Sequence, residues 1–191
     1  MHIAIEGIDG VGKSSVSKKI AEILGFIYVE KPLHYLFDEG DGLKNYIRIR
    51  DFVNKQSDRV FTSWFYGLGN IYTLMRFKGE NIITDRHLLS NYSWSGTSES
   101  EPVFDLLVQK IGCPDITFIL YASPETVLKR ISSRDENDND KSKVQYIPEL
   151  YNKMELFCIK HKMLYEIIQT DNLSFEEEVA LIVRRIEALR K

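Results

Sequence analysis

Short apolar runs alternate with longer segments of helical periodicity along this chain. The apolar runs indicate β-strands, which we expect at residues 2–6, 26–29, 81–84, 116–121 and 165–169. Strands that alternate with helical segments are typical of repeated βαβ units, in which the strands run parallel. The pattern therefore predicts an α/β fold with a five-stranded parallel sheet flanked by helices.

The helices are marked by their ends as well as by the spacing of their apolar residues. Gly25 is a stop signal for the first helix, whose expected inward residues are Val16, Ile20, Ile23 and Leu24. Ser123 followed by Pro124 begins another helix, with an expected inward face of Val127, Leu128 and Ile131. Ser174 and Glu177 form a capping box for the last helix, which we expect to bury Phe175, Val179, Ile182, Ile186 and Leu189.

Two helices are expected between about residues 37 and 77, and the second is rich in aromatic residues. Its apolar side chains follow the i, i+3, i+4 spacing of one helix face: Phe61, Trp64, Phe65, Leu68, Tyr72 and Met75. Burial in the core explains that spacing by itself, so we expect a buried stripe. The alternative is an exposed stripe that pairs with a second copy of the chain in a homodimer.

The composition is that of an ordinary globular protein. With 191 residues, 43% of them hydrophobic and 28% charged, the chain suits a single domain over residues 1–191. Its 25 basic and 28 acidic residues give a formal charge of −3, so we expect no nucleic-acid polymer as a partner. No run approaches the roughly 18 apolar residues of a membrane span. Cys113 and Cys158 lack metal-ligand spacing, which favours reduced thiols and a cytoplasmic protein.

The clearest motif lies between the first strand and the first helix. Residues 7–14 match G-x-x-x-x-G-K-[ST], a P-loop, in which glycines let the chain wrap a phosphate with successive N–H groups pointing at it. Lys13 is expected to neutralise the β- and γ-phosphates of ATP, and Ser14 to ligate magnesium. A mere glycine-rich turn would leave those N–H donors unpaired. The expected ATP-binding residues are Gly7, Ile8, Asp9, Gly10, Val11, Gly12, Lys13, Ser14 and Ser15.

Three charged residues are expected beside this loop. Asp9 lies within it, where its carboxylate either stays in solvent or accepts a hydrogen bond from a second substrate, such as a sugar hydroxyl. Asp85 and Arg86 follow the third strand, at the sheet edge where open α/β proteins bind ligands. We expect Asp85 to reach the magnesium shell and Arg86 to fork onto an acceptor phosphate. The alternative is a structural Asp–Arg pair that ties strand to helix.

A charged stretch without apolar residues runs from Arg134 to Lys143. It cannot join a core, so it is either a surface loop or a lid, at about residues 134–146, that closes over phosphates. Arg130 and Arg134 lie one helical turn apart, and a lid would let them stabilise the charge of a phosphoryl group in transfer. Without a lid they form a solvated face.

Together these segments resemble the thymidylate kinase family and its relatives, the deoxynucleoside kinases. Residues 6–15 are similar to the thymidylate kinase P-loop, its aspartate included, and residues 85–90 to the family's D-R-[YH]-x-x-S segment. Residues 113–115 before the fourth strand, and Arg130 with Arg134 before a lid, follow in the same order. The resemblance covers nearly the whole chain.

The resemblance implies a three-layer P-loop kinase fold with a short lid, ATP with Mg²⁺ as the phosphoryl donor, and a nucleoside monophosphate as the acceptor. It implies that Asp9 faces the acceptor sugar, Arg86 holds its phosphate and Phe65 stacks on its base, while residues 170–172 lie near the adenine. The expected catalytic residues are then Lys13, Asp85, Arg86, Arg130 and Arg134. The expected acceptor-binding residues are Asp9, Glu30, Lys31, Phe65, Arg86 and Ser90. The expected metal ligands are Ser14 and Asp85.

Two positions depart from the family's pattern. Gly69 stands where thymidylate kinases usually carry an arginine, and the second strand ends Glu30-Lys31-Pro32 instead of Arg-Glu-Pro. An acceptor phosphate needs a cationic clamp, whereas a 5′-hydroxyl needs a base. Arg86 and Lys31 favour the clamp, and hence a deoxynucleoside monophosphate, with dTMP first. Glu30 keeps open a deoxynucleoside kinase, and the two departures keep open an ATP-binding regulatory module with little catalysis.

Overall fold

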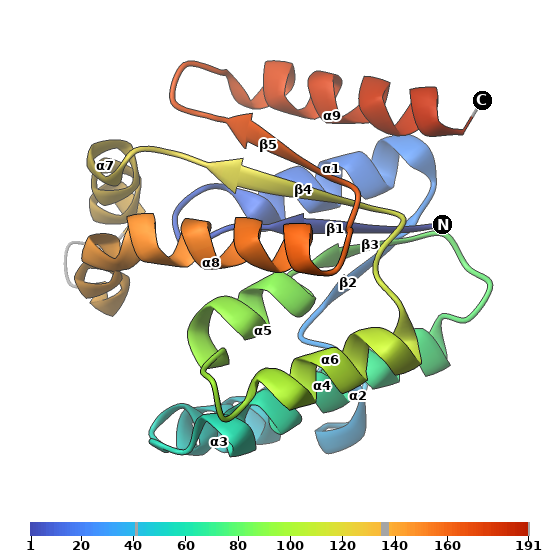
Figure 1. Cartoon of the computed structure of the whole chain (residues 1–191). Helices are drawn as coiled ribbons and strands as arrows, with labels where there is room; N and C mark the ends of the chain where they lie inside the picture. The colour runs from blue at the N-terminus through green and yellow to red at the C-terminus, as the bar shows by residue number, and fades with distance from the viewer. Residues whose placement is uncertain (41, 135–137, 191) are drawn as a thin grey trace.

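Within residues 1–40, 42–134 and 138–190, which the computed structural model describes, five parallel strands form one sheet in the order β2-β3-β1-β4-β5 (Figure 1). The strands are β1 His2–Glu6, β2 Ile27–Glu30, β3 Ile82–Asp85, β4 Ile116–Tyr121 and β5 Tyr165–Gln169. The prediction of a five-stranded parallel sheet is confirmed, and each strand lies within one residue of its expected bounds.

Helices cover both faces of the sheet (Figure 1). On one face α1 packs beside α9, and on the other α5 packs beside α8, with α4 and α6 beneath α5. The helices are α1 Lys13–Leu24, α2 His34–Phe37, α3 Lys44–Asn54, α4 Arg59–Arg76, α5 Leu88–Ser95, α6 Glu101–Ile111, α7 Pro124–Arg134, the 3₁₀ segment η1 Asn139–Tyr146, α8 Ile147–Lys160 and α9 Phe175–Leu189. In the described part of the chain, none of them has the length and apolar character needed to cross a bilayer.

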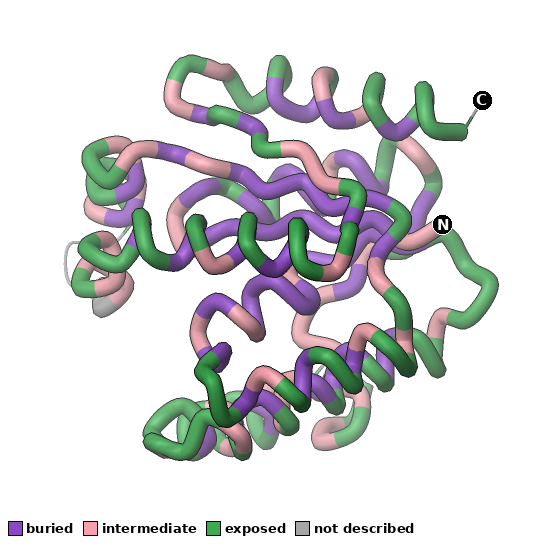
Figure 2. The backbone as a smooth tube through the Cα atoms, viewed as in Figure 1, coloured by how far each residue is buried: buried purple, intermediate pink, exposed green. Residues whose placement is uncertain are grey.

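The core follows the central strands, where burial is nearly continuous (Figure 2). β1 and β4 have a neighbouring strand on each side and helices on both faces, so they bury successive residues rather than alternate ones. The fully buried apolar residues there include Ile3, Ile5, Phe118 and Leu120. Glu6 ends β1 and is also fully buried, which makes it an exception that needs a partner.

Helix α4 turns its small and polar residues inward, so the predicted buried stripe is wrong. Its buried residues are Thr62, Ser63, Gly67, Gly69, Asn70, Tyr72 and Thr73. Of the predicted stripe, Tyr72 is buried and Phe65 half-buried, whereas the exposed residues are Phe61, Trp64, Leu68 and Met75. The cause is close packing, because a Cβ at Gly67 would lie only 2.8 Å from Leu107 Cδ1 of α6. Small residues let α4 approach α6, and the bulky apolar side chains point away.

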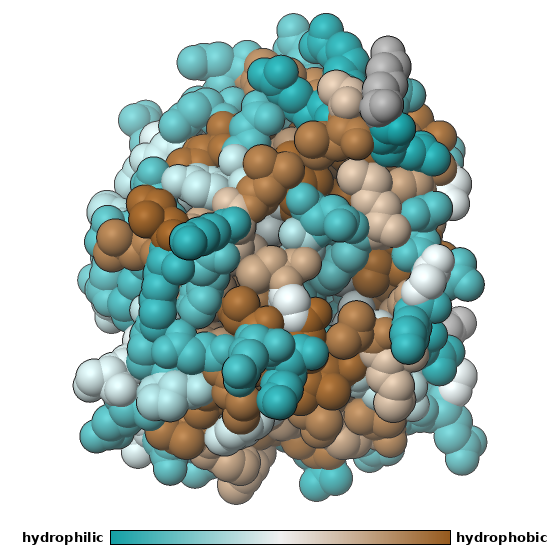
Figure 3. Space-filling view, turned by 45° about the vertical axis from the view of Figure 1, so that its right-hand side comes forward, coloured by the Kyte–Doolittle hydropathy of each residue, from teal (hydrophilic) through white to brown (hydrophobic). Residues whose placement is uncertain are grey.

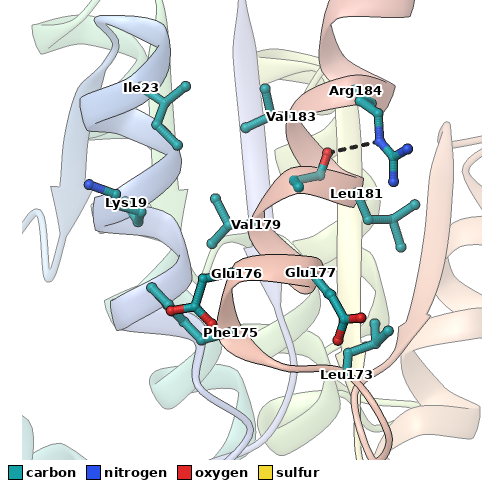
Figure 4. Close-up of a pocket in the computed structure, with 11 residues that line it drawn as sticks. Lys19, Ile23, Leu173, Phe175, Glu176, Glu177, Val179, Leu181, Val183 and Arg184 are labelled. Carbon is teal, nitrogen blue, oxygen red and sulfur yellow. Dashed lines mark hydrogen bonds between the residues drawn. The ribbon is translucent and has the colours of Figure 1, made fainter.

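On helices α1, α7 and α9, fewer of the expected inward residues are buried than the apolar spacing indicates. Val16, Ile20, Val127, Ile131, Val179, Ile182 and Ile186 are buried as expected. Ile23 and Phe175 are instead exposed, because they line an open groove of about 840 Å³ between α1 and α9 (Figure 4). Leu128 is exposed because it lies about 100° around the helix from Val127, and Leu189 because it ends α9.

Candidate active site

The loop between β1 and α1 has the backbone of a phosphate cradle. Gly7, Gly10 and Gly12 have φ values of 135°, 89° and 94°, in the left-handed region that favours glycine. A Cβ at Gly7 would lie 2.5 Å from the carbonyl oxygen of Leu120, so a larger residue does not fit there. Helix α1 begins directly after Gly12 with no side-chain cap, which leaves its first-turn N–H groups directed at the loop.

Lys13 lies inside this loop and is buried, with 6% of its surface exposed. Its Nζ donates to the carbonyl oxygen of Ile8 at 2.5 Å. Burial and the nearby guanidinium of Arg86 lower the pKa of Lys13 to about 8, against the opposing effect of nearby carboxylates. The side chain is therefore a cation at neutral pH, held where the loop would surround a phosphate.

Asp85 and Ser14 meet at the carboxyl end of β3. Ser14 Oγ donates to Asp85 Oδ2, while the buried Asp85 Oδ1 has no hydrogen-bond partner. Magnesium takes oxygen ligands and usually combines one or two carboxylates with substrate phosphates and water. Among the described residues, no group of three or more His, Cys, Asp or Glu side chains is arranged to hold a metal. A hydroxyl beside an unpartnered carboxylate oxygen fits a magnesium ion that arrives with ATP.

Arg86 ties the end of β3 to the P-loop. Its guanidinium forms an ion pair with Asp9 and donates to the Gly7 carbonyl at 3.1 Å and to Ser90 Oγ at 3.1 Å. Its φ of 75° is strained for a non-glycine residue, a feature that clusters at functional sites. Although burial disfavours the charged form, the cations of Arg86 and Lys13 hold the pKa of Asp9 well below its usual value. A structural Asp85–Arg86 pair was the alternative expected from the sequence. In the structure the carboxylate that pairs with Arg86 is that of Asp9.

Glu6 holds the segment that carries Arg86, a role that the sequence analysis missed. Its carboxylate accepts hydrogen bonds from the backbone N–H groups of His87 at 2.8 Å, Leu89 at 3.0 Å and Ser90 at 3.2 Å, and also from the Ser90 hydroxyl. These donors begin helix α5, so Glu6 caps it from β1. The available signal was a carboxylate at the end of an otherwise apolar strand, next to the P-loop.

Glu30 and Lys31 lie together at the end of β2, beside this cluster. Lys31 Nζ donates to Glu30 Oε1 at 2.9 Å, and the hydroxyl of Tyr28 donates to Glu30 Oε2 at 2.6 Å. Although burial disfavours the charged form, these two donors hold the pKa of Glu30 below its usual value. Lys31, predicted to bind the acceptor phosphate, and Glu30, the candidate base, are therefore hydrogen-bonded to each other.

The predicted lid at residues 134–146 is described only in part, since residues 135–137 lie outside the described residues. From η1, Lys143 Nζ lies 3.3 Å from Asp9 Oδ2 and 2.6 Å from Asp140 Oδ1. Lys143 is a cation that the sequence analysis did not select, although it ends the charged stretch. The structure brings it to the P-loop.

The two arginines expected at the phosphates have other partners. Arg134 forms ion pairs with Asp138 and, at 3.3 Å, with Asp140. Arg130 donates to the Thr170 hydroxyl at 3.0 Å and to the Thr170 carbonyl at 2.9 Å. Arg130 thus anchors the segment after β5, which the resemblance assigns to the adenine, and Arg134 binds the acids of its own segment.

An aromatic wall lies on α2, α3 and α4. The ring of Phe65 stacks on Phe37 with centroids 6.3 Å apart and ring planes 11° apart, and it meets Tyr66 edge-on at 5.1 Å. Burial raises the pKa values of Tyr46 and Tyr66, and both hydroxyls lie within electrostatic reach of Arg86. The wall therefore lies near the arginine expected to hold the acceptor phosphate. The sequence analysis selected Phe65 from this wall and missed both tyrosines.

Gly69, the first departure from the family's pattern, is packed rather than open. A Cβ at this position would lie 3.3 Å from Leu33 Cγ and 3.4 Å from Pro32 Cγ. The segment after β2 therefore lies against the position where the family usually carries an arginine, and a long side chain does not fit there without movement of that segment.

Comparison with known proteins identifies a family whose model matches this chain. The model of the family described as thymidylate kinase matches residues 72–179. The thymidylate kinase of Brachyspira hyodysenteriae is 29% identical over 142 residues, which cover 69% of this chain and 68% of the relative. The probable thymidylate kinase of Methanosarcina mazei is 21% identical over 207 aligned positions, which cover 99% of this chain and 97% of the relative.

Solved structures share the fold over the whole length. The structure of deoxyadenosine kinase from M. mycoides with bound dATP has a TM-score of 0.68 at 21% identity, covering 98% of this chain and all of that one. The thymidylate kinase of Candida albicans has a TM-score of 0.71 at 14% identity, covering 99% of this chain and 92% of that one. The predicted three-layer P-loop kinase fold is thereby confirmed.

Proposed function

The chain belongs to the thymidylate kinase family, and we propose that it transfers the γ-phosphoryl group of ATP to a deoxynucleoside monophosphate, with dTMP as the first acceptor. One observation carries the proposal. The guanidinium of Arg86 donates to Gly7 of the P-loop, so the cation for an acceptor phosphate directly adjoins the cradle for the donor. An acceptor phosphate is already ionised, and cations on both sides of the transferred group are what its chemistry needs.

The donor side is assigned to four groups of the chain. The P-loop N–H groups and Lys13 would bind the β- and γ-phosphates, and Ser14 with Asp85 would hold the magnesium ion. When bound, magnesium neutralises charge on the phosphate oxygens. Lys143 adds a further cation beside Asp9. The role of Arg130 and Arg134 in phosphoryl transfer stays a prediction. Their present partners favour structural roles, in which Arg130 fixes the segment expected near the adenine and Arg134 fixes the lid segment.

The acceptor side is assigned to the groups around Arg86. Ser90 and Asp9 bind its guanidinium and would orient it toward the acceptor phosphate, and we assign the side of Asp9 to the acceptor sugar. Phe65, on the aromatic wall of α2, α3 and α4, offers a ring face for the base. We propose that one domain carries both halves of the reaction and that the enzyme works in the cytoplasm, where ATP and reduced thiols such as Cys113 are found.

A deoxynucleoside kinase is the second candidate, favoured by the position of Glu30. Glu30 is in register with Asp85 on the neighbouring strand, so its carboxylate lies at the same sheet edge as the P-loop. A carboxylate there would accept the proton of a 5′-hydroxyl, as transfer to a nucleoside requires.

An acceptor panel with the Glu30→Gln variant separates the candidates. At fixed MgATP we expect ADP release with deoxynucleoside monophosphates and none with nucleosides. Glu30→Gln should leave most of the monophosphate activity, because a phosphate oxygen needs no base, whereas loss of a required base costs about 10²- to 10⁴-fold. Activity confined to nucleosides, lost in Glu30→Gln, would establish the second candidate. Tight ATP binding without transfer to any acceptor would instead support a regulatory module.

We also propose that the enzyme is a homodimer paired through α4. Exposed apolar residues of α4 include five with alternating spacings of three and four, the pattern of a helix that packs on another helix: Phe61, Trp64, Leu68, Ile71 and Met75. Leu74, also exposed, lies beside Met75 and widens the stripe. On the face shown in Figure 3, hydrophobic groups gather in the lower part, at the height of α4 and α6 in Figure 1. A second copy of the same helix is the partner that such a uniform stripe fits, because each stripe then meets its equivalent across a twofold axis.

Leu68→Glu is expected to convert the dimer to a monomer. Leu68 is at the centre of the stripe and 44% exposed, so the change removes apolar contact and places two carboxylates opposite each other. Light scattering coupled to size exclusion should give half the mass of the wild type. Lys55→Glu, an exposed change just after α3, is the matched control and should stay dimeric. A wild-type protein that is monomeric at high concentration would refute the pairing.

A further inference from the structure

The hydroxyl of Tyr28 lies between the carboxylates of two neighbouring strands. It donates to Glu30 Oε2 at 2.6 Å and lies 3.5 Å from Asp85 Oδ2. The same Asp85 oxygen accepts the hydroxyl of Ser14 from α1. The phenol oxygen therefore lies between β2 and β3, and Asp85 continues the contact to the start of α1.

The fold fixes the position of this phenol. Tyr28 precedes Glu30 by two residues, so both side chains lie on the same face of β2. Parallel pairing aligns Glu30 with Asp85, which brings the second carboxylate to that face. The ammonium of Lys18 on α1 lies 5.2 Å from the centre of the Tyr28 ring and holds it from above. The Tyr28 hydroxyl therefore lies next to the carboxylates of both Glu30 and Asp85.

The hydrogen bonds leave a particular set of acceptors free. A hydroxyl has one hydrogen, and the short distance assigns that of Tyr28 to Glu30. The lone pairs of the phenol oxygen then face the side of Asp85, whose buried Oδ1 has no partner of its own. Magnesium bound by phosphates retains several waters, and their hydrogens need acceptors of this kind.

We propose that Tyr28 is a positioning residue for the magnesium site, whose hydroxyl holds Glu30 beside Asp85 and, together with Glu30, provides acceptors for metal-bound water. The inference rests on the proposed function only in taking Ser14 and Asp85 as the metal-binding groups. Groups that hydrogen-bond to metal ligands and orient them typically contribute about 10- to 100-fold to metal affinity. A purely structural role, packing the ring on the edge strand, would give no such contribution from the hydroxyl alone.

Tyr28→Phe tests this proposal by removing only the hydroxyl. With a non-hydrolysable ATP analogue kept fully bound by excess protein, Mn²⁺ is titrated and its free concentration is read by electron paramagnetic resonance. We expect Mn²⁺ affinity to fall about tenfold, with the affinity for the analogue in the absence of metal unchanged. In turnover, the Mg²⁺ concentration for half-maximal rate should rise by the same factor, while the KM for ATP at saturating Mg²⁺ stays constant.

Tyr92→Phe is the matched control, because the Tyr92 hydroxyl also donates to a glutamate, Glu101 at 2.9 Å, between α5 and α6. It should leave Mn²⁺ affinity unchanged. Unchanged Mn²⁺ affinity in a folded Tyr28→Phe protein overturns the proposal. If Tyr28→Phe does not fold, Glu30→Ala removes the acceptor of the Tyr28 hydroxyl, and it must then weaken Mn²⁺ binding. The metal titration uses no acceptor, so an error in the proposed acceptor leaves its result intact.

Discussion

Lys13→Met is expected to lower kcat/KM by about a thousandfold while the protein stays folded. The ammonium of Lys13 is buried within the P-loop and bound to the Ile8 carbonyl, where no exposed cation can replace it. Donor phosphates that enter the loop would meet an ammonium that is itself largely shielded from water, and a charge contributes most where water screens it least. Steady-state kinetics with saturating acceptor measures the loss of turnover, and calorimetry measures the loss of ATP affinity.

Two controls make the result specific. Lys19→Met changes a half-buried lysine of the same helix that pairs with Glu22 away from the loop, so its activity should match the wild type. Because the pKa of Lys13 is lowered to about 8, wild-type affinity for ATP should weaken as the pH rises above about 8, where the side chain loses its charge. The affinity of Lys13→Met should not change there. If Lys13→Met binds and turns over ATP normally, the P-loop is not the donor site.

Glu6→Gln is expected to lower the free energy of unfolding by about 3 kcal/mol. The carboxylate is fully buried and accepts four hydrogen bonds from residues at the start of α5. An amide of the same shape presents an NH₂ group to one pair of these donors, so at least one buried N–H group loses its partner. Because that segment carries Arg86, activity should fall as well. Urea denaturation followed by circular dichroism measures the loss.

Glu177→Gln provides the comparison, since Glu177 also caps a helix by accepting a backbone hydrogen bond, from Ser174 at 2.8 Å. That cap is exposed to water, so its loss should cost less than about 1 kcal/mol. Equal effects of the two changes would mean that burial of Glu6 contributes nothing to the capping of α5, contrary to our interpretation.

Local features of this protein were predictable because contiguous residues determine them. The P-loop motif lies within eight consecutive residues, with left-handed backbone angles at its glycines, and the Ser174–Glu177 capping box closes within one helical turn. The strands were predictable for a related reason, since a strand buried on both faces needs an unbroken apolar run. These elements, with the order in which they follow one another, were enough to indicate the fold class.

The site was predictable only where its residues adjoin a motif. Lys13, Ser14 and Asp85 follow from the P-loop and from the strand that ends beside it. Lys143 reaches Asp9 across 134 positions of sequence, and Arg86 binds Asp9 across 77, so neither pairing has a local signal. The sequence favoured Arg130 and Arg134 as the lid cations, whereas in the structure these two bind other groups.

The sequence by itself determined the alternation of strands and helices, the P-loop conformation and the chemical classes of residue at the sheet edge. Tertiary structure decided which face of α4 is buried, because Gly67 permits close packing on Leu107 and the apolar spacing alone cannot distinguish a core from a second copy. It also decided which polar side chains meet, as Tyr28, Glu30 and Asp85 do. Backbone preferences act between neighbours in sequence, whereas packing and Coulomb forces act between neighbours in space, and only the folded chain defines the latter.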